Sequence, residues 1–198
     1  MAAKTDEDLV REFCKTQDEA AYIELMNRYL TKMRRLLFSV LPGSPEDRED
    51  AEQEILAALF FDLPRFRFGS AFGTFFYRYV RNKAVDLVRK NQREHRRVRA
   101  FRMEARSGVA SASSPEDSLL LRESAQEVLD AVLALPDAER TLLFLKDSEE
   151  LSVKQIAAVM SIPEGTVKSR LHRARERVAA ALSSTRTSAR SMEADHAT

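Results

Sequence analysis

The sequence contains no tryptophan, a single cysteine, and only five glycines and six prolines among 198 residues. One cysteine, Cys14, excludes an internal disulfide framework and fits a reducing compartment. No segment approaches the roughly 18 consecutive apolar residues that a membrane-spanning helix needs. The polar, acidic N-terminal stretch also lacks the apolar core of a signal peptide. We therefore expect a cytoplasmic protein without membrane insertion.

The residues that catalysis or metal binding usually require are scarce as well. The histidines, His95, His172 and His196, are isolated from one another in the sequence. There is no glycine-rich phosphate loop, no nucleophile elbow, and no Cys/His cluster with the spacing of metal ligands. Cys14 fits a small buried hydrophobic residue. These absences predict a protein that is not an enzyme and that binds no metal and no cofactor.

Charge is abundant but unevenly distributed. Hydrophobic residues make up 44% of the chain and charged residues 32%, which suits one globular domain or two small ones. Acidic residues dominate segments 44–62 and 115–150, whereas basic residues dominate 81–106 and 164–178. The net charge of +1 therefore conceals alternating blocks. A basic block suits phosphates, and an acidic block suits the basic surface of another protein.

Apolar residues recur with a helical period along nearly the whole chain, and β-branched residues do not alternate over any useful length. Asp18 is positioned to cap a helix over residues 19–40. Ser44 followed by Pro45 is the expected start of the next helix, because proline suits the first helical position. A long helix is expected from about residue 70 into the low hundreds. Four further helices are expected over residues 116–134, 137–147, 152–160 and 163–182.

The stretch "SGVASASSP" at 107–115 is small, polar and without periodicity, which is typical of a flexible linker. We therefore predict an all-α protein with two small helical domains joined by this linker. The first domain is expected over residues 1–100, the linker over 101–117 and the second domain over 118–183. Residues 184–198 lack apolar surface, so we expect a disordered tail, with a regulatory contact as the alternative.

The second domain contains a helix-turn-helix pattern, "LSVKQIAAVMSIPEGTVKSRLHRARERV", at 151–178. Ser161 and Glu164 fit the capping-box pattern for the second helix. A buried stripe is expected on that helix at Val167, Leu171, Ala174 and Val178. The remaining faces are polar and mostly basic, as in a helix whose N-terminal half reaches base edges while flanking cations hold phosphates. A solvated surface helix is the alternative for this segment taken by itself.

Two helices of the first domain carry distinctive exposed faces. The segment "EDAEQEILAALF" at 49–60 presents an acidic stripe of Asp50, Gln53 and Glu54, which suits a basic or polar partner. The segment "FGTFFYRYVRNKAVDLVRK" at 72–90 interleaves aromatic and basic residues. That combination suits single-stranded DNA, in which bases stack or flip out and phosphates need cations.

The second domain resembles the C-terminal promoter-reading domain of bacterial RNA polymerase sigma factors, most of all the extracytoplasmic-function (ECF) group of the sigma-70 family. The resemblance is carried by "LP…ER…L" at 135–142, "LS…IA" at 151–157 and "IPEGTVKSRLHRAR" at 162–175. Glu150 and Ser161 stand where the family usually has glycine. The resemblance implies that the second domain binds the −35 promoter element. The implied −35 contacts are Glu164, Thr166, Lys168, Ser169, Arg170, His172, Arg173 and Arg175.

The first domain resembles the other half of the same family. The acidic stripe at Asp50, Gln53 and Glu54 matches the helix that grips the polymerase. The 72–90 segment matches the helix that melts DNA and reads the −10 element, and Phe75 stands where a tryptophan is common. The resemblance implies a pocket for a flipped base near "RFGSA" and Asn82. The implied −10 contacts are Arg78, Arg81, Asn82, Asp86, Arg89 and Lys90.

The resemblance as a whole implies a sigma factor that binds core RNA polymerase and directs it to promoter DNA. It also implies control by an anti-sigma factor. Two alternatives remain at this point. One is a stand-alone helix-turn-helix DNA-binding regulator. The other is an RNA-binding adaptor that uses the basic helix at 81–106, which would bind its nucleic acid without polymerase.

Overall fold

The computed structural model describes residues 4–41, 44–101 and 119–195, and all secondary structure in these ranges is helical. The predicted all-α fold class is therefore confirmed, and the expected linker falls almost entirely outside the described residues. The first part of the chain forms α1 (Asp6–Thr16), α2 (Glu19–Val40), α3 (Pro45–Asp62), the short 3-10 helix η1 (Leu63–Arg65) and α4 (Phe72–Phe101). The second part forms α5 (Leu119–Leu133), α6 (Asp137–Leu143), the π-helical η2 (Phe144–Ser148), α7 (Val153–Met160) and α8 (Glu164–Asp195).

Helix starts in the first part follow local capping chemistry. The Asp18 carboxylate accepts a hydrogen bond from the Ala20 amide at 3.0 Å, and Ser44 Oγ accepts from the Asp47 amide at 3.2 Å, so both predicted caps are confirmed. Helix α1 was not expected from the sequence. It begins at a capping box in which Thr5 and Asp8 each bind the other's backbone amide.

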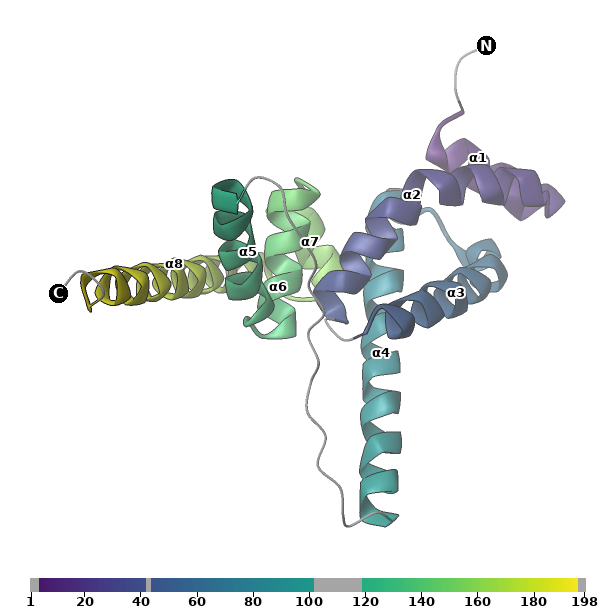
Figure 1. Cartoon of the computed structure of the whole chain (residues 1–198). Coiled ribbons are helices and arrows are strands. Elements are labelled where there is room, and N and C mark those ends of the chain that lie inside the picture. The colour runs from purple at the N-terminus through teal and green to yellow at the C-terminus, as the bar shows by residue number, and fades with distance from the viewer. Residues whose placement is uncertain (1–3, 42–43, 102–118, 196–198) are drawn as a thin grey trace.

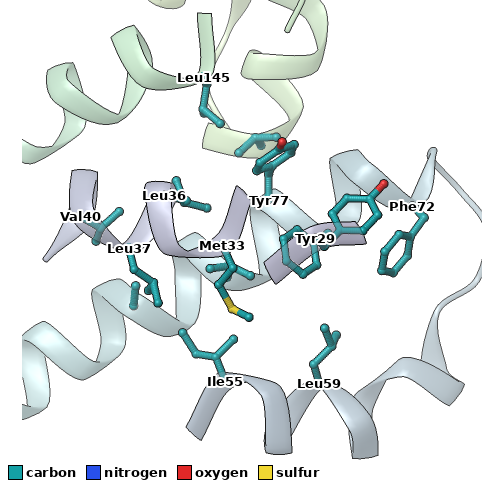
Figure 2. Close-up of a cluster of buried hydrophobic side chains, with 14 of the residues drawn as sticks. Tyr29, Met33, Leu36, Leu37, Val40, Ile55, Leu59, Phe72, Tyr77 and Leu145 are labelled. Carbon is teal, nitrogen blue, oxygen red and sulfur yellow. The ribbon is translucent and has the colours of Figure 1, made fainter. Parts of the chain in front are cut away.

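Helix α2 is the centre of the first domain, because α1, α3 and α4 all pack against it. Its buried Tyr29 and Met33 face Ile55 and Leu59 of α3 and Phe72 of α4 (Figure 2). The ring centroids of Tyr29 and Phe72 are 5.0 Å apart in an edge-to-face arrangement. This core fixes the direction in which α3 and α4 leave it, and α4 projects well beyond the other helices (Figure 1).

In the second domain, α7 and α8 form the predicted helix-turn-helix unit. A capping box of Ser152 and Gln155 starts α7. The expected capping box of Ser161 and Glu164 is wrong. Ser161 instead ends α7 in a left-handed conformation, with φ of 55°, because the tight turn requires such a residue there. Helix α8 begins at Glu164, so its N-cap position is residue 163, and Ser161 lies two residues too early to cap it.

Helix α8 extends further than the sequence analysis expected. It continues to Asp195, whereas a disordered tail was expected from residue 184. No glycine or proline occurs after Gly165, and the alanine-rich stretch that follows Arg177 favours helix propagation. Disorder was expected because the tail lacks apolar residues. That lack argues against packing on the rest of the protein but not against a helix.

The two domains pack against each other. Helix α6 and η2 lie against α2, and α7 lies against α4. Leu145 of η2 reaches the side of the first-domain core near Tyr77 (Figure 2). The Tyr77 hydroxyl donates a hydrogen bond to the Glu149 carboxylate, and Arg140 Nε donates to the Ser39 carbonyl at 2.6 Å. The buried side chains of both domains thus form one continuous cluster.

Candidate nucleic-acid interface

Helix α8 presents a cationic face on a buried stripe. Val167, Leu171 and Ala174 are buried as predicted, and Val178 is half-buried. Of the predicted −35 contacts, Thr166 and Arg170 are half-buried. The exposed members are Glu164, Lys168, Ser169, His172, Arg173 and Arg175. The first three turns or so of the helix therefore offer polar side chains to a ligand, while the opposite side anchors the helix to α7.

Local hydrogen bonds divide these side chains into two groups. Ser169 Oγ donates to the Thr166 carbonyl at 3.1 Å, and Arg173 Nε lies 3.4 Å from the Ser169 carbonyl. These contacts lie along the helix and leave the guanidinium tip of Arg173 accessible. Arg175 differs, because its Nη2 donates to the carboxylate of Asp147 in η2 at 2.7 Å. Arg175 is therefore directed toward the body of the second domain.

The backbone at the start of α8 is also open. Gly165 lies in the first turn, and a Cβ placed on it would meet no atom within 4 Å. The first helical turn exposes backbone amides that have no partner within the helix. A phosphate can approach such amides closely, since the helix dipole favours negative charge there.

Helix α4 has a concave face of mixed aromatic and polar character. A cavity of about 160 Å³ is lined by Phe75, Arg78, Tyr79, Asn82, Lys83 and Asp86. These positions recur at the spacing of a single helix face. The Tyr79 hydroxyl donates to the Asp62 carboxylate of α3 at 2.8 Å, which fixes its ring, and burial raises the pKa of that hydroxyl. Lys83 Nζ lies 5.6 Å from the centre of the same ring.

The predicted −10 contacts are only partly brought together. Arg78, Asn82 and Asp86 line the cavity, whereas Arg89 and Lys90 are exposed further along α4. Asp86 and Arg89 form a loose ion pair at 3.8 Å.

Arg81 is half-buried beside the cavity, and burial lowers the pKa of its guanidinium. Its Nη1 donates to the Asn82 Oδ1 at 3.2 Å, which orients the amide.

The cavity differs from the expected pocket. Asn82 lines it, but none of residues 67–71 does. Tyr79 and Lys83 were not among the predicted site residues. Tyr79 lies four residues after Phe75 and three before Asn82, and Lys83 lies eight residues after Phe75. These spacings, which place side chains on one helix face, were the signal that could have found them.

The acidic stripe of α3 is presented as predicted. Asp50, Gln53 and Glu54 are all exposed, and among the described residues no ion pair engages either carboxylate. The same helix face continues to Phe61, whose side chain is 75% exposed. The face therefore combines unpaired negative charge with an exposed apolar ring, which suits a partner surface that is both basic and apolar.

Two family models match the chain. Sigma-70 region 2 matches residues 25–94, and sigma-70, region 4 matches residues 125–178. The chain is 34% identical over 179 residues to the ECF RNA polymerase sigma-E factor of Escherichia coli (strain K12), covering 88% of this chain and 92% of that protein. It is 30% identical over 168 residues to the ECF RNA polymerase sigma factor SigW of Bacillus subtilis (strain 168), covering 82% and 89%.

Solved structures share the fold. CnrH, in complex with the cytosolic domain of CnrY, matches with a TM-score of 0.66 at 20% identity, covering 91% of this chain and 99% of that chain. The sigma factor RpoE, in complex with the anti-sigma factor NepR from Bartonella quintana, matches with a TM-score of 0.63 at 24% identity, covering 81% and 97%.

Regions 2 and 4, each on its own helical domain, define a sigma factor of the sigma-70 family, a class of transcription initiation factor. The identity to the curated relatives over most of both chains places this protein within that class, and it belongs to the ECF group. It is therefore a subunit that associates with RNA polymerase and directs it to promoters. No helix in the described ranges is long and apolar enough to cross a membrane.

Proposed function

We propose that three separate surfaces of this ECF sigma factor divide the work of promoter recognition. The acidic stripe of α3 docks on core RNA polymerase, the concave face of α4 takes the −10 element, and the N-terminal half of α8 reads the −35 duplex. The observation that carries this assignment is the presence of two DNA-compatible faces of different chemistry on one chain. One is purely polar and cationic, and the other combines rings with cations.

The chemistry of α8 suits double-stranded DNA. A helix enters the major groove with its first turns against base edges, and lysine and arginine match the acceptors of guanine. Lys168 and Arg173 are exposed near the start of α8, and Gly165 leaves the backbone open to a phosphate. Arg175, which is tied to Asp147, is better placed to brace the helix than to read a base.

The chemistry of α4 suits a single strand. A base that leaves the stack needs an aromatic ring against its face and hydrogen-bonding groups at its edge. The α4 cavity combines the Phe75 and Tyr79 rings with the Asn82 amide and the Lys83 ammonium group. This sigma factor binds and melts DNA without a catalytic step of its own, and its place beside polymerase and DNA is the cytoplasm.

The packed arrangement of the two domains does not match a promoter. Elements at −35 and −10 lie about 25 base pairs apart, or roughly 85 Å along the duplex at 3.4 Å per base pair. Helix α7 touches α4, is about 12 Å long and leads directly into α8, so the start of α8 lies within roughly 30 Å of α4. The domains therefore separate before both elements are bound.

We also propose an anti-sigma protein as a regulatory partner. The solved structures of CnrH and RpoE hold a bound CnrY domain and the anti-sigma factor NepR, respectively. A partner that binds the packed arrangement more tightly than the separated one would shift the equilibrium toward the packed arrangement.

The assignment is tested by two charge-altering pairs of substitutions. Transcription of a fragmented bacterial genome by core polymerase plus this protein should first produce new start sites that share two upstream motifs. Asp50→Arg with Glu54→Arg should then abolish binding to core polymerase and leave duplex −35 binding intact. Lys168→Ala with Arg173→Ala should weaken duplex binding and leave polymerase binding intact, so each pair is the control for the other. Loss of both activities from either pair would refute the assignment.

A further inference from the structure

The second domain meets α2 around a large cavity of about 520 Å³. One wall is the last part of α2, with Arg35, Phe38 and Ser39. The other walls come from α5, α6, η2 and α8 of the second domain. Helix α6 packs against both α2 and α8, and α5 packs against α8. The cavity is therefore complete only while the two domains are packed together.

The lining of this interdomain cavity is mostly apolar. Protein interiors leave few voids larger than a water molecule, so a space of this size calls for an explanation. Five large hydrophobic side chains are exposed among the described residues, and two of them, Val128 (44% exposed) and Leu129 (37%), line this cavity. Phe38 also lines it, and the Arg48 guanidinium lies 5.3 Å from the centre of that ring. A cavity of about 300–1,000 Å³ with mostly hydrophobic walls is typical of a small-molecule site.

Positive charge prevails among the few polar groups of the lining. Among the described residues, the only acidic side chain that lines the cavity is Asp147, and Arg175 pairs with it at 2.7 Å. The Arg140 guanidinium is nearly buried and donates to Asp137 at 2.6 Å. Arg35 is exposed, and no ion pair engages it within the described part of the chain. Arg35 is therefore the guanidinium that is left to bind an anion.

The volume of the cavity decides between a small molecule and a partner helix. One turn of an α-helix with its side chains occupies about 400–600 Å³, which is the volume of the whole cavity. A helix of ordinary length would leave most of its residues outside. A hydrocarbon chain can be enclosed, and a polar group at its end can reach the exposed Arg35. Apolar walls with one unpaired arginine at their edge thus suit a molecule with an apolar chain and an anionic head.

We propose that this cavity binds a single-chain amphiphile with an anionic head group, such as a long-chain carboxylate, and that the bound molecule holds the two domains together. The hydrocarbon chain lies against Phe38, Val128 and Leu129, and the head group pairs with Arg35. The ligand thereby contacts α2 in the first domain and α5 in the second. A ligand that binds only the packed arrangement shifts the equilibrium toward it. The cavity shares no side chain with the acidic stripe of α3 or with the α4 cavity.

The test is isothermal titration calorimetry of the full-length protein with hexanoate, octanoate and decanoate, each below the concentration at which it forms micelles. Burying one methylene group strengthens binding by about fourfold, so each step of two carbons should gain about 15-fold. Decyltrimethylammonium has the same chain and the opposite charge, and it should bind more weakly than decanoate. Equal affinities for the three carboxylates, or for decanoate and decyltrimethylammonium, would overturn the proposal.

The head-group contact is tested separately with Arg35→Gln. This substitution should weaken decanoate binding by about three- to fivefold, the range of an exposed ion pair. It should leave the binding of decanol, which has no charge, unchanged. Equal changes for decanoate and decanol would refute the pairing of the head group with Arg35.

The place of the hydrocarbon chain is tested with a matched pair of variants on α8. Ala179 and Ala180 are both exposed, but only Ala179 lines the cavity. Ala179→Trp fills the cavity and should abolish decanoate binding, whereas Ala180→Trp should retain it. Leu129→Glu, which places a negative charge in the wall, should also abolish binding. Equal affinities in Ala179→Trp and Ala180→Trp, at equal thermal stability, would show that decanoate binds elsewhere and would overturn the proposal.

Hydrogen exchange tests the effect of the ligand on the domains. Decanoate should slow exchange in α2 and α6, which meet at the domain contact, in the wild type and not in Ala179→Trp. Specific binding without slower exchange would refute the claim that the ligand holds the domains together. Size-exclusion chromatography identifies a second copy of the chain as the occupant. A dimer that Ala179→Trp converts to a monomer would overturn the assignment of the cavity to an amphiphile.

Discussion

Arg140 provides the most direct test of how this fold is held together. Its side chain is only 3% exposed, yet it carries a full charge. Nη1 donates to the Leu133 carbonyl at 2.7 Å and to the Leu135 carbonyl at 3.0 Å, Nε donates to the Ser39 carbonyl at 2.6 Å, and Nη2 donates to the Asp137 carboxylate at 2.6 Å. All five guanidinium donors are fixed in one plane, so four such bonds can form together.

The carbonyls that accept hydrogen bonds from Arg140 lie at helix ends. Leu133 ends α5 and Leu135 follows it, while Ser39 lies in the last turn of α2. The last carbonyls of a helix have no partner within it and carry the negative end of the helix dipole. Neither α2 nor α5 has a basic residue in its last turn. One cation of the second domain therefore caps a helix in each domain.

Replacing Arg140 by methionine keeps much of the side-chain volume and removes every donor. A hydrogen bond to a charged group contributes about 1.5–3 kcal/mol, and removing one partner from a buried charged network costs about 3–5 kcal/mol. We expect Arg140→Met to lower the free energy of unfolding by about 4 kcal/mol, because three carbonyls lose their donor. The cost is not larger, because the Asp137 side chain is exposed and water can replace its partner. For a chain of this size the midpoint of thermal unfolding should fall by roughly 8–16 °C.

The control is Arg65→Met, which removes an arginine from an ion pair with Asp62 at 2.9 Å. Arg65 is 82% exposed, so its loss should cost less than about 1 kcal/mol. Urea unfolding followed by circular dichroism measures both differences. Equal midpoints for Arg140→Met and wild type would refute the reasoning that buried helix ends depend on this cation.

Two further predictions concern the packed domains and the DNA contacts. Tyr77→Phe should loosen the packing of α7 on α4, because the Glu149 carboxylate would lose its hydrogen bond from the Tyr77 hydroxyl. The other carboxylate oxygen of Glu149 is buried and already lacks a partner among the described residues. Hydrogen exchange should then quicken in both helices, and unchanged exchange would contradict the role given to that hydrogen bond. Lys168→Ala should reduce the slope of log K against log[salt] for duplex binding by about one unit if Lys168 meets a phosphate, and an unchanged slope would exclude that contact.

Much of the helical framework followed from local signals. Asp18 caps α2 and Ser44 caps α3 as predicted, because a cap depends on residues adjacent in the sequence. Helix α1 was missed, since it is only 11 residues long and buries just Leu9, Val10 and Phe13. So short an apolar pattern is weak evidence for a helix when its packing partner is unknown.

Backbone conformation was harder to predict from the sequence. The positive φ at Glu150 and Ser161 agrees with their standing where the family usually has glycine. Nothing in the sequence indicated the positive φ at Phe68. Glycine adopts the left-handed conformation most readily, so residue propensities predict it at the adjacent Gly69 instead. The reading of Ser161 as a cap for α8 failed for the related reason that S-x-x-E describes spacing and not the conformation of the first residue.

The contact between the domains was invisible to the sequence analysis, and it changes how the DNA-facing residues are understood. The packing uses Leu145, Glu149 and Arg140 on one side and Tyr77 and Ser39 on the other. None of these residues belongs to the predicted −10 or −35 faces, and most members of those faces are exposed in the packed arrangement. Packing therefore does not hide the chemistry that would contact DNA. It sets the distance between the two faces. If each face binds the element proposed for it, the packing limits the spacing that the protein can span and leaves the DNA-contacting side chains of each face exposed.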